Sequence, residues 1–354
     1  MTESCALSRA AADTSALEAM RQIGRVLRRG RSLSRFASGE PVSLDLLRLH
    51  GVPVDALTAV GLADVVGDSA QLQVRIERWG SALVVVAPND GHGAYAGADS
   101  LWLATEAMRW GLPGDRVLDI GAGGGAALAL LAPRFPRAIA SDISLAGLAV
   151  ARLTAAVDGR FRIATVVSDL ASTVPDRSID SVIANPPWVP AALADLDVAG
   201  RSGGVHGIEL PLRFLAEITR VLAPSGRSVL LTIDPTISGG ARPLVDAVRK
   251  LQCVGYEVEA RPTRANVLFA DAIRRLVEGS PSISDMRHVV VRLAAPARRS
   301  VTFTADGLDL VPADVLPATA APPRHRHRPD PAVVEGPAPY TSYSAPTPSK
   351  RRRS

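Results

Sequence analysis

The sequence is poor in cysteine and in long apolar runs, and each absence excludes classes of protein. The only cysteines among the 354 residues are Cys5 and Cys253, too few for a disulfide framework or a cysteine-based metal site. The longest apolar stretches, such as 126–132, are far shorter than the ~20 residues that a membrane-spanning helix needs. The first residues show no basic segment followed by an apolar one, so no signal peptide is expected. These features predict a soluble, cytoplasmic protein without a membrane partner.

The body of the chain also lacks an excess of positive charge, although the net charge is +5 and the pI is about 9.7. Residues 312–354 hold seven Lys or Arg and three Asp or Glu, a net charge of +4, which leaves about +1 for the other 311 residues. Enzymes that act on nucleic acids usually carry basic charge on their folded surface. The distribution therefore argues against a nucleic-acid acceptor, although six arginines within 17–36 could contact phosphates.

Composition changes along the chain suggest four segments. Ten of the 27 prolines lie within 312–354, and such a segment cannot bury a core, so we expect a disordered Pro/Arg-rich tail over 298–354. Residues 1–15 are expected to be a flexible N-terminus. Between these ends, the patterns predict an N-terminal module over 16–88 and a larger domain over 89–297.

The N-terminal module has the pattern of a small α+β unit. Helical spacing over 17–36 is followed by two short helical patterns separated by Gly-Val-Pro, and then by an alternating hairpin segment. This order is winged-helix-like, with 81–88 as a closing buried strand. The second short helix, 55–64, has two acids and no base, so a role as a substrate lid or dimer platform is preferred to DNA reading.

Helix and strand patterns alternate through the larger domain. This alternation of apolar strands with helices predicts an α/β fold with a doubly wound parallel sheet. The expected strands are 116–120, 137–141, 161–167, 178–185, 227–233, 256–262 and 287–293, and the expected helices are 100–110, 123–132, 144–156, 208–222 and 240–253.

A glycine-rich turn follows the first of these strands, in DIGAGGG at 119–125. Gly121, Gly123 and Gly125 let the backbone turn tightly and approach a ligand without a Cβ in the way. The turn departs from the dinucleotide pattern G-x-G-x-x-G, because its third glycine position is Ala126. Asp119, at the strand end, suits a cationic ligand better than a pyrophosphate.

Acidic residues also end the next two strands. Asp142 is placed to accept ribose hydroxyls, and Asp169 is placed to meet an adenine amino group. No phosphate-binding lysine or arginine lies in these loops. A ligand with an adenosine, a positive charge and no phosphates is S-adenosylmethionine (SAM), which we predict as the cofactor; no metal is expected.

The fourth strand is followed by Asn185, Pro186, Pro187 and Trp188. Amide and exocyclic aryl nitrogens are planar, with a delocalised lone pair. The side-chain oxygen of Asn185 and the carbonyl of Pro186 could each accept one N–H, which would draw such a nitrogen towards tetrahedral geometry. The prolines hold these acceptors in place, and Trp188 offers a face for stacking.

On these residues, the chain resembles the class I SAM-dependent methyltransferases over roughly 95–295. The resemblance implies a seven-stranded Rossmann-like sheet, with Asp119, Gly121, Gly123, Gly125, Asp142, Asp169 and Asn185 at the cofactor. Within that class, NPPW and the segment 202–227 are similar to release-factor glutamine N5-methyltransferases and related N-methyltransferases. Trp188 stands where those enzymes have tyrosine, His206 stands where they commonly have an acid, and the N-terminal module differs from their helical bundle.

Four residues near the expected crevice are candidates for substrate contact: Tyr95, Asp99, Ser100 and His206. Asp99 and Ser100 could instead cap a helix. The sequence therefore predicts an N-methyltransferase acting on a planar nitrogen of a protein, peptide or small molecule. The alternatives are an rRNA, tRNA or DNA adenine or guanine N-methyltransferase, a natural-product methyltransferase, and a SAM-binding protein without catalysis. The oligomeric state is left open.

Overall fold

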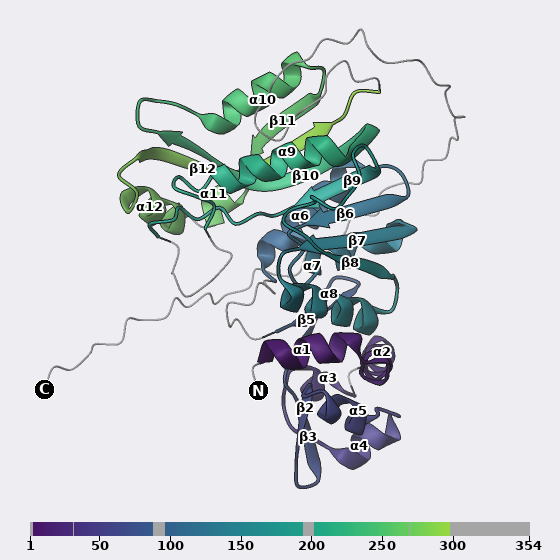
Figure 1. Ribbon diagram of the computed structural model, residues 1–354. Helices are drawn as coiled ribbons and strands as arrows, with labels where there is room; N and C mark the ends of the chain where they lie inside the picture. Colours follow the sequence, from purple (N-terminus) through teal and green to yellow (C-terminus); the bar gives the residue numbers. More distant parts are fainter. Residues whose placement is uncertain (1–2, 31, 88–95, 194–201, 269, 298–354) are drawn as a thin grey trace, which may run out of the picture. The chain divides into compact units, whose positions relative to one another are not determined.

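The computed structural model of the chain describes residues 3–30, 32–87, 96–193, 202–268 and 270–297 (Figure 1). These residues belong to one compact unit, Met1–Leu316, and a second unit, Pro317–Ser354, lies outside the described residues. The tail predicted over 298–354 therefore lies outside them as well.

A seven-stranded sheet forms the larger domain, with the strand order β11-β12-β10-β9-β6-β7-β8. Neighbouring strands from β10 to β8 are parallel, whereas β12 runs antiparallel to both β10 and β11. The prediction of a doubly wound α/β sheet is confirmed. The strands are β6 (Arg116–Ile120), β7 (Arg137–Asp142), β8 (Ile163–Val167), β9 (Ile179–Ala184), β10 (Leu222–Ile237), β11 (Glu257–Pro262) and β12 (Ile283–Ala294).

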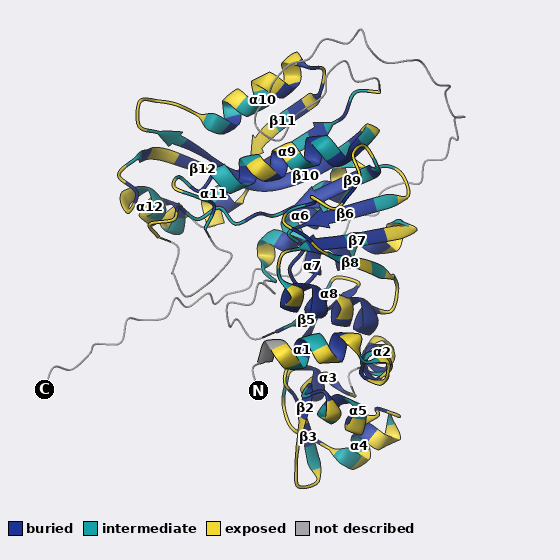
Figure 2. Ribbon diagram, in the orientation of Figure 1, coloured by how far each residue is buried: buried dark blue, intermediate teal, exposed yellow. Residues whose placement is uncertain are grey.

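Helices cover both faces of this sheet, which explains why its central strands are apolar on both sides (Figure 2). Apolar side chains of α9 and α10 pack on one face, and those of α6 and α7 pack on the other. The helices are α6 (Ala98–Trp110), α7 (Ala126–Leu131), α8 (Leu145–Asp158), α9 (Glu209–Val221), α10 (Pro243–Cys253), α11 (Ala265–Leu268) and α12 (Ala270–Glu278), with a 3-10 turn η1 (Ala132–Arg134). The pair α11 and α12, between β11 and β12, is not predicted by the sequence patterns.

The N-terminal segment has the predicted order of helix, turn, helix and hairpin. Strands β1, β3 and β2 form a three-stranded sheet, and β4 pairs with β5 in a separate hairpin. The elements are α1 (Glu3–Ala12), α2 (Thr14–Arg29), α3 (Ser34–Ala37), β1 (Val42–Ser43), α4 (Leu44–Leu49), α5 (Val54–Ala59), β2 (Ala63–Val66), β3 (Ser69–Leu72), β4 (Arg75–Trp79) and β5 (Ala82–Val86). The boundary at residues 88 and 89 stays a prediction.

Two expectations for this segment need correction. A flexible N-terminus over 1–15 is wrong for α1, because its Leu7, Ala10 and Ala11 are buried in the same apolar cluster as residues of α8. The helix expected over 17–36 ends at Arg29 and is followed by the separate α3. Short alanine-rich stretches have a weak amphipathic pattern, so α1 could not be predicted from the sequence. It is buried because it packs on α8.

A buried carboxylate fixes the N-terminal segment to α8. The side chain of Asp158 is fully enclosed and accepts hydrogen bonds from Nη2 of Arg28, at 2.7 Å, and from the N–H of Leu83, at 2.9 Å. Nε of Arg160 is bound to its other oxygen at 2.8 Å. Arg28 on α2 and Leu83 on β5 are thereby held by one residue at the end of α8.

Candidate active site

The two sequence motifs lie side by side at the carboxyl edge of the sheet. The glycine-rich turn follows β6 and NPPW follows β9, and these parallel neighbours place Ile120 opposite Ala184. The chain runs outwards from β6 through β7 and β8, and returns to β9 on the other side of β6. Such a reversal of strand order opens a crevice beyond the strand ends, where doubly wound proteins bind ligands.

The turn after β6 requires glycine because three of its residues have a left-handed backbone. The angle φ is +70° at Gly121, +50° at Gly123 and +71° at Gly125. A Cβ at Gly121 would lie 3.0 Å from the ring of Phe214, and one at Gly125 would lie 3.0 Å from Cβ of Ala151. Gly121 and Gly125 therefore cannot carry a side chain without strain, and the backbone of the turn can approach a ligand closely.

Two carboxylates lie next to this turn. One oxygen of Asp142 accepts the N–H of Gly123 at 2.8 Å, and the other accepts the N–H of Ser144 at 2.7 Å. Burial raises the pKa of Asp142, against the opposing effect of these hydrogen bonds. Asp119 is 3% exposed, and its pKa is raised well above the ordinary value, first by burial and then by the negative charge of Asp142.

These features fit SAM. Carboxylates whose ionised forms are disfavoured by burial and mutual repulsion are stabilised by a positively charged ligand, such as one with a sulfonium or ammonium group. Beside Asp142, the apolar side chain of Ile143 is 75% exposed and can contact a flat ring. The residues that would hold the cofactor are Asp119, Gly121, Gly123, Gly125 and Asp142.

Asp169 has a more exposed position than these residues. It follows β8, the edge strand beyond β7, and 62% of its side chain is accessible to solvent. Its carboxylate forms an ion pair with Nη2 of Arg213 at 3.0 Å. A contact of Asp169 with adenine stays a prediction, and Arg213 would then share the carboxylate.

The amide of Asn185 has a defined orientation. Its Nδ2 donates a hydrogen bond of 2.8 Å to Oδ2 of Asp99, which lies in the first turn of α6. Because a carboxylate can only accept hydrogen bonds, this contact turns the amide oxygen away from Asp99. That oxygen, Oδ1, is enclosed and has no hydrogen-bond partner among the residues that the structure describes.

A glycine-rich segment, 203–207, packs against the backbone of the NPPW loop. The N–H of Gly203 donates to the carbonyl of Val189 at 2.8 Å. A Cβ at Gly203 would lie 2.7 Å from Cα of Trp188 and would clash with the carbonyl of Gly207. The Gly-Gly-x-x-Gly spacing of 203–207 thus permits a backbone contact that fixes the position of Trp188.

The other predicted substrate residues are distributed differently. Tyr95 lies outside the described residues. Ser100 is buried, and its N–H contacts Oδ1 of Asp99 at 2.9 Å; the cap position of α6 is a glycine, so neither side chain is the N-cap. His206 is occupied locally, since its Nδ1 lies 2.6 Å from Oε1 of Glu209. Asp99 is therefore the substrate candidate that the structure joins directly to NPPW.

Two residues near Trp188 are not predicted from the sequence as part of the site. The ring of His288, on β12, lies edge-on to Trp188 and to Trp102, with centroid distances of 5.5 Å and 6.4 Å. Trp102 could have been found, because it follows Asp99 by three residues and three-residue spacing places both on one helix face. A single histidine within RHVVVRL gives no comparable signal.

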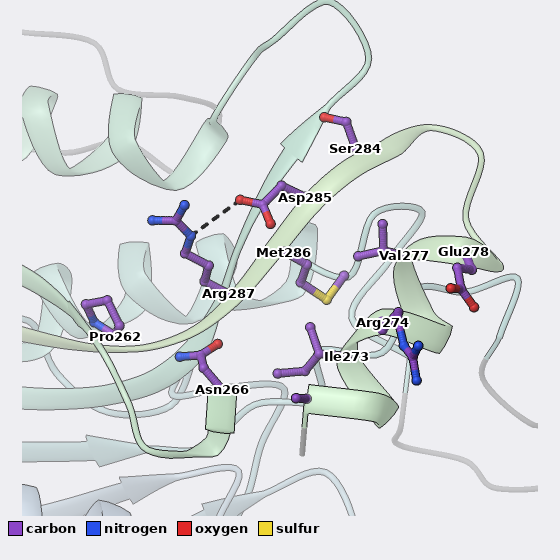
Figure 3. A pocket seen from close by; sticks show the side chains of 11 residues that line it. Pro262, Asn266, Ile273, Arg274, Val277, Glu278, Ser284, Asp285, Met286 and Arg287 are labelled. Carbon is purple, nitrogen blue, oxygen red and sulfur yellow. Dashed lines mark ion pairs between the residues drawn. The ribbon is translucent and has the colours of Figure 1, made fainter. Parts of the chain in front are cut away.

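A hollow of about 570 Å³ lies between α11, α12 and β12 (Figure 3). Apolar Ile273 and Met286 line it together with the charged Arg274 and Arg287, and Figure 3 shows Asn266 beside them. None of the lining residues belongs to the glycine turn or to NPPW. The hollow is therefore separate from the two motifs.

No helix in the described part of the chain is both long and apolar enough to cross a bilayer. Nor do the described residues include a group of three His, Cys, Asp or Glu side chains that could hold a metal ion.

Comparison with known proteins finds a family match over the region that contains both motifs. Residues 99–201 match the family described as Methyltransferase small domain. In this region the chain is similar to SAM-dependent methyltransferases. The match includes the cofactor turn, Asp142, Asp169 and NPPW, whereas the N-terminal segment lies outside it.

Two curated relatives share part of this methyltransferase domain. The release factor glutamine methyltransferase of Koribacter versatilis is 34% identical over 141 residues, which are 36% of this chain and 47% of the relative. The tRNA1(Val) (adenine(37)-N6)-methyltransferase of Porphyromonas gingivalis is 30% identical over 169 residues, which are 45% of this chain and 62% of the relative. The chain thus spans about half the length of the curated relatives it matches.

Solved structures give a weaker likeness. A ribosomal protein L11 methylase from Lactobacillus delbrueckii subsp. bulgaricus is 18% identical, with a TM-score of 0.37, over 57% of this chain and 81% of the other. At this TM-score the likeness supports no conclusion about activity.

Proposed function

We propose that this protein is a SAM-dependent N-methyltransferase that acts on a planar nitrogen, an amide or an exocyclic amine, of a protein, peptide or small molecule. The orientation of Asn185 carries the proposal. Asp99 accepts from its Nδ2, so the enclosed Oδ1 is left as an acceptor without a partner among the described residues. An enclosed, unpaired acceptor is costly, and an N–H of a substrate would satisfy it.

In this proposal, different residues bind and orient the substrate. SAM supplies an electrophilic methyl group when it is bound. Asn185 Oδ1 accepts one N–H of the substrate, and the carbonyl of Pro186 accepts the other, so the nitrogen lone pair leaves conjugation. Trp188 stacks on the planar group, and the backbone contact of Gly203 keeps the loop in place. Orientation of this kind supplies a large part of the rate, and no strong base is required if the proton leaves after methylation.

A nucleic-acid acceptor is less favoured, because three of the four arginines of α2 form ion pairs within the protein. Arg21 and Arg25 both bind Glu18, at 3.0 Å and 2.6 Å. Arg28 binds the enclosed Asp158. Phosphate contact would have to replace these ion pairs, so this helix does not offer a free basic stripe.

The two cysteines bear on the location of the enzyme. Cys5 and Cys253 are both exposed and free. Exposed free thiols are typical of reducing compartments. We therefore infer a cytoplasmic protein.

Transfer of labelled methyl groups tests this function. The purified protein and tritiated SAM are incubated with cell extract separated into protein, RNA and small-molecule fractions, and Asn185→Ala is run in parallel. A methylated amide nitrogen releases volatile methylamine on acid hydrolysis, whereas a methylated base is recovered as its nucleoside after nuclease digestion.

We expect label in the protein or small-molecule fraction, recovered as a methylated nitrogen, and little label with Asn185→Ala. Label in RNA would instead establish the nucleic-acid alternative. Label recovered on oxygen would contradict the planar-nitrogen mechanism, and binding of SAM without transfer to any fraction would favour a protein without catalysis.

A further inference from the structure

His288 is held rigidly beside Trp188 of the acceptor motif, NPPW at 185–188. It lies on β12 opposite Ile233 of β10 and is 2% exposed. Its Nδ1 lies 2.7 Å from Oγ1 of Thr263, and its backbone N–H donates to Oδ1 of Asn266 at 2.8 Å. Nδ2 of Asn266 donates in turn to the carbonyl of His288 at 2.7 Å. The segment leading into α11 thus fixes both the backbone and the ring of this residue.

The imidazole ring joins two indoles that come from different elements. Its plane makes an angle of 75° with Trp188 of the NPPW loop and 70° with Trp102 of α6. Edge-to-face contacts of this type are favourable and restrict the rotation of each ring. Since α6 also holds Asn185 through Asp99, the helix reaches the acceptor motif by two routes.

The ring is uncharged at neutral pH. Burial lowers the pKa of His288 to about 4. The remaining ring nitrogen, Nε2, forms no hydrogen bond with the described residues. Among the described residues, the side chain of His288 therefore contacts NPPW only through its ring contact with Trp188.

We propose that His288 is a positioning residue of the acceptor site, which acts by holding the indole of Trp188 in the plane needed to stack on the substrate. This role rests on the proposed N-methyltransferase function. Thr263 holds the imidazole and Asn266 holds the backbone of His288; the imidazole in turn holds Trp188, and Trp188 holds the planar acceptor group. The short helix α11 thereby contributes to catalysis without contacting substrate.

A double-mutant cycle tests this chain of contacts. Transfer of tritiated methyl groups to the protein fraction of cell extract is measured for the wild type, H288A, W188A and the double variant, with the amount of extract varied. H288F keeps an aromatic edge without ring nitrogens. V290A removes apolar volume from the same buried strand and serves as a control for lost stability.

We expect H288A to lower the maximal transfer rate at least tenfold while changing the affinity for SAM less than twofold. In the W188A background the same change should lower the rate less than twofold, because the two residues act in one path. H288F should keep at least a third of the wild-type rate. The indole fluorescence of H288A, but not of V290A, should differ from that of the wild type.

Other outcomes overturn the role. Independent effects of H288A and W188A would show that His288 does not act through Trp188, and an equal loss of rate in V290A would show a general effect of stability. If the wild type transfers no methyl group to any fraction, the proposed function itself fails, which is a separate result from additivity in an active enzyme.

Discussion

Replacing Asp99 by asparagine changes a single charge next to the acceptor motif. In the wild type, the carboxylate accepts from Nδ2 of Asn185 at 2.8 Å and so determines which way the amide faces. The amide introduced by Asp99→Asn would present both a donor and an acceptor, and its donor could bind Oδ1 of Asn185. The oxygen that we propose accepts a substrate N–H would then be occupied in part of the molecules.

The size of the effect follows from the types of hydrogen bond. A hydrogen bond to a charged group contributes about 1.5–3 kcal/mol, and a neutral one contributes about 1 kcal/mol. Asp99→Asn therefore weakens the preferred orientation by about 0.5 to 2 kcal/mol, which corresponds to about a two- to thirtyfold lower rate of transfer. The affinity for SAM should change little, since Asp99 is not among the residues that fit the cofactor.

Single-turnover transfer from tritiated SAM measures this rate, and calorimetry measures SAM affinity. Glu106→Gln is the matched control, because Glu106 lies on the same helix and binds Arg292 at 2.6 Å, away from the motif. It should lower stability and leave the rate unchanged. A full rate in Asp99→Asn, or a loss explained by SAM affinity alone, would refute the proposed role of Asp99.

Three further predictions concern stability and loop geometry. The pKa of His288 is about 4 in the folded state and 6.5 in the unfolded state, so between these values the unfolded state binds more protons. The free energy of unfolding is therefore highest above pH 6.5 and falls by about 3 kcal/mol towards pH 4. His288→Phe should reduce this dependence on pH, measured by urea titration. Asp158→Ala leaves Arg28 without its enclosed partner and should lower the free energy of unfolding by about 3 kcal/mol; a loss under about 1 kcal/mol would contradict this. Gly203→Ala should push Trp188 aside and reduce methyl transfer, whereas Gly30→Ala, which has open space, should have the wild-type rate.

Most of the sheet could be predicted because its strands carry their own signal. The strand 116–120 is found at the predicted residues, and the strand before NPPW ends within one residue of the prediction. Buried parallel strands are continuously apolar, and the motif residues follow directly after them, so their common edge could be inferred. Asp142 and Asn185 lie at that edge as expected.

The features that could not be predicted depend on contacts between segments that are far apart in the sequence. The burial of α1 depends on α8, and the orientation of Asn185 depends on Asp99, 86 residues earlier. His288 lies 100 residues after Trp188 and is recognised only through its ring contact. The ion pair of Asp169 could not be predicted from its place after β8, because its partner Arg213 lies on α9.

The most direct test of the account is the effect of Asn185→Ala on binding and transfer measured in the same preparation. We expect SAM affinity within about threefold of the wild type, because the residues proposed to hold the cofactor are mainly those of the turn after β6 and Asp142. We also expect a fall of at least about a hundredfold in single-turnover methyl transfer, because the oriented acceptor Oδ1 is lost. Wild-type transfer by this variant would contradict the central claim that Asn185 orients a planar nitrogen.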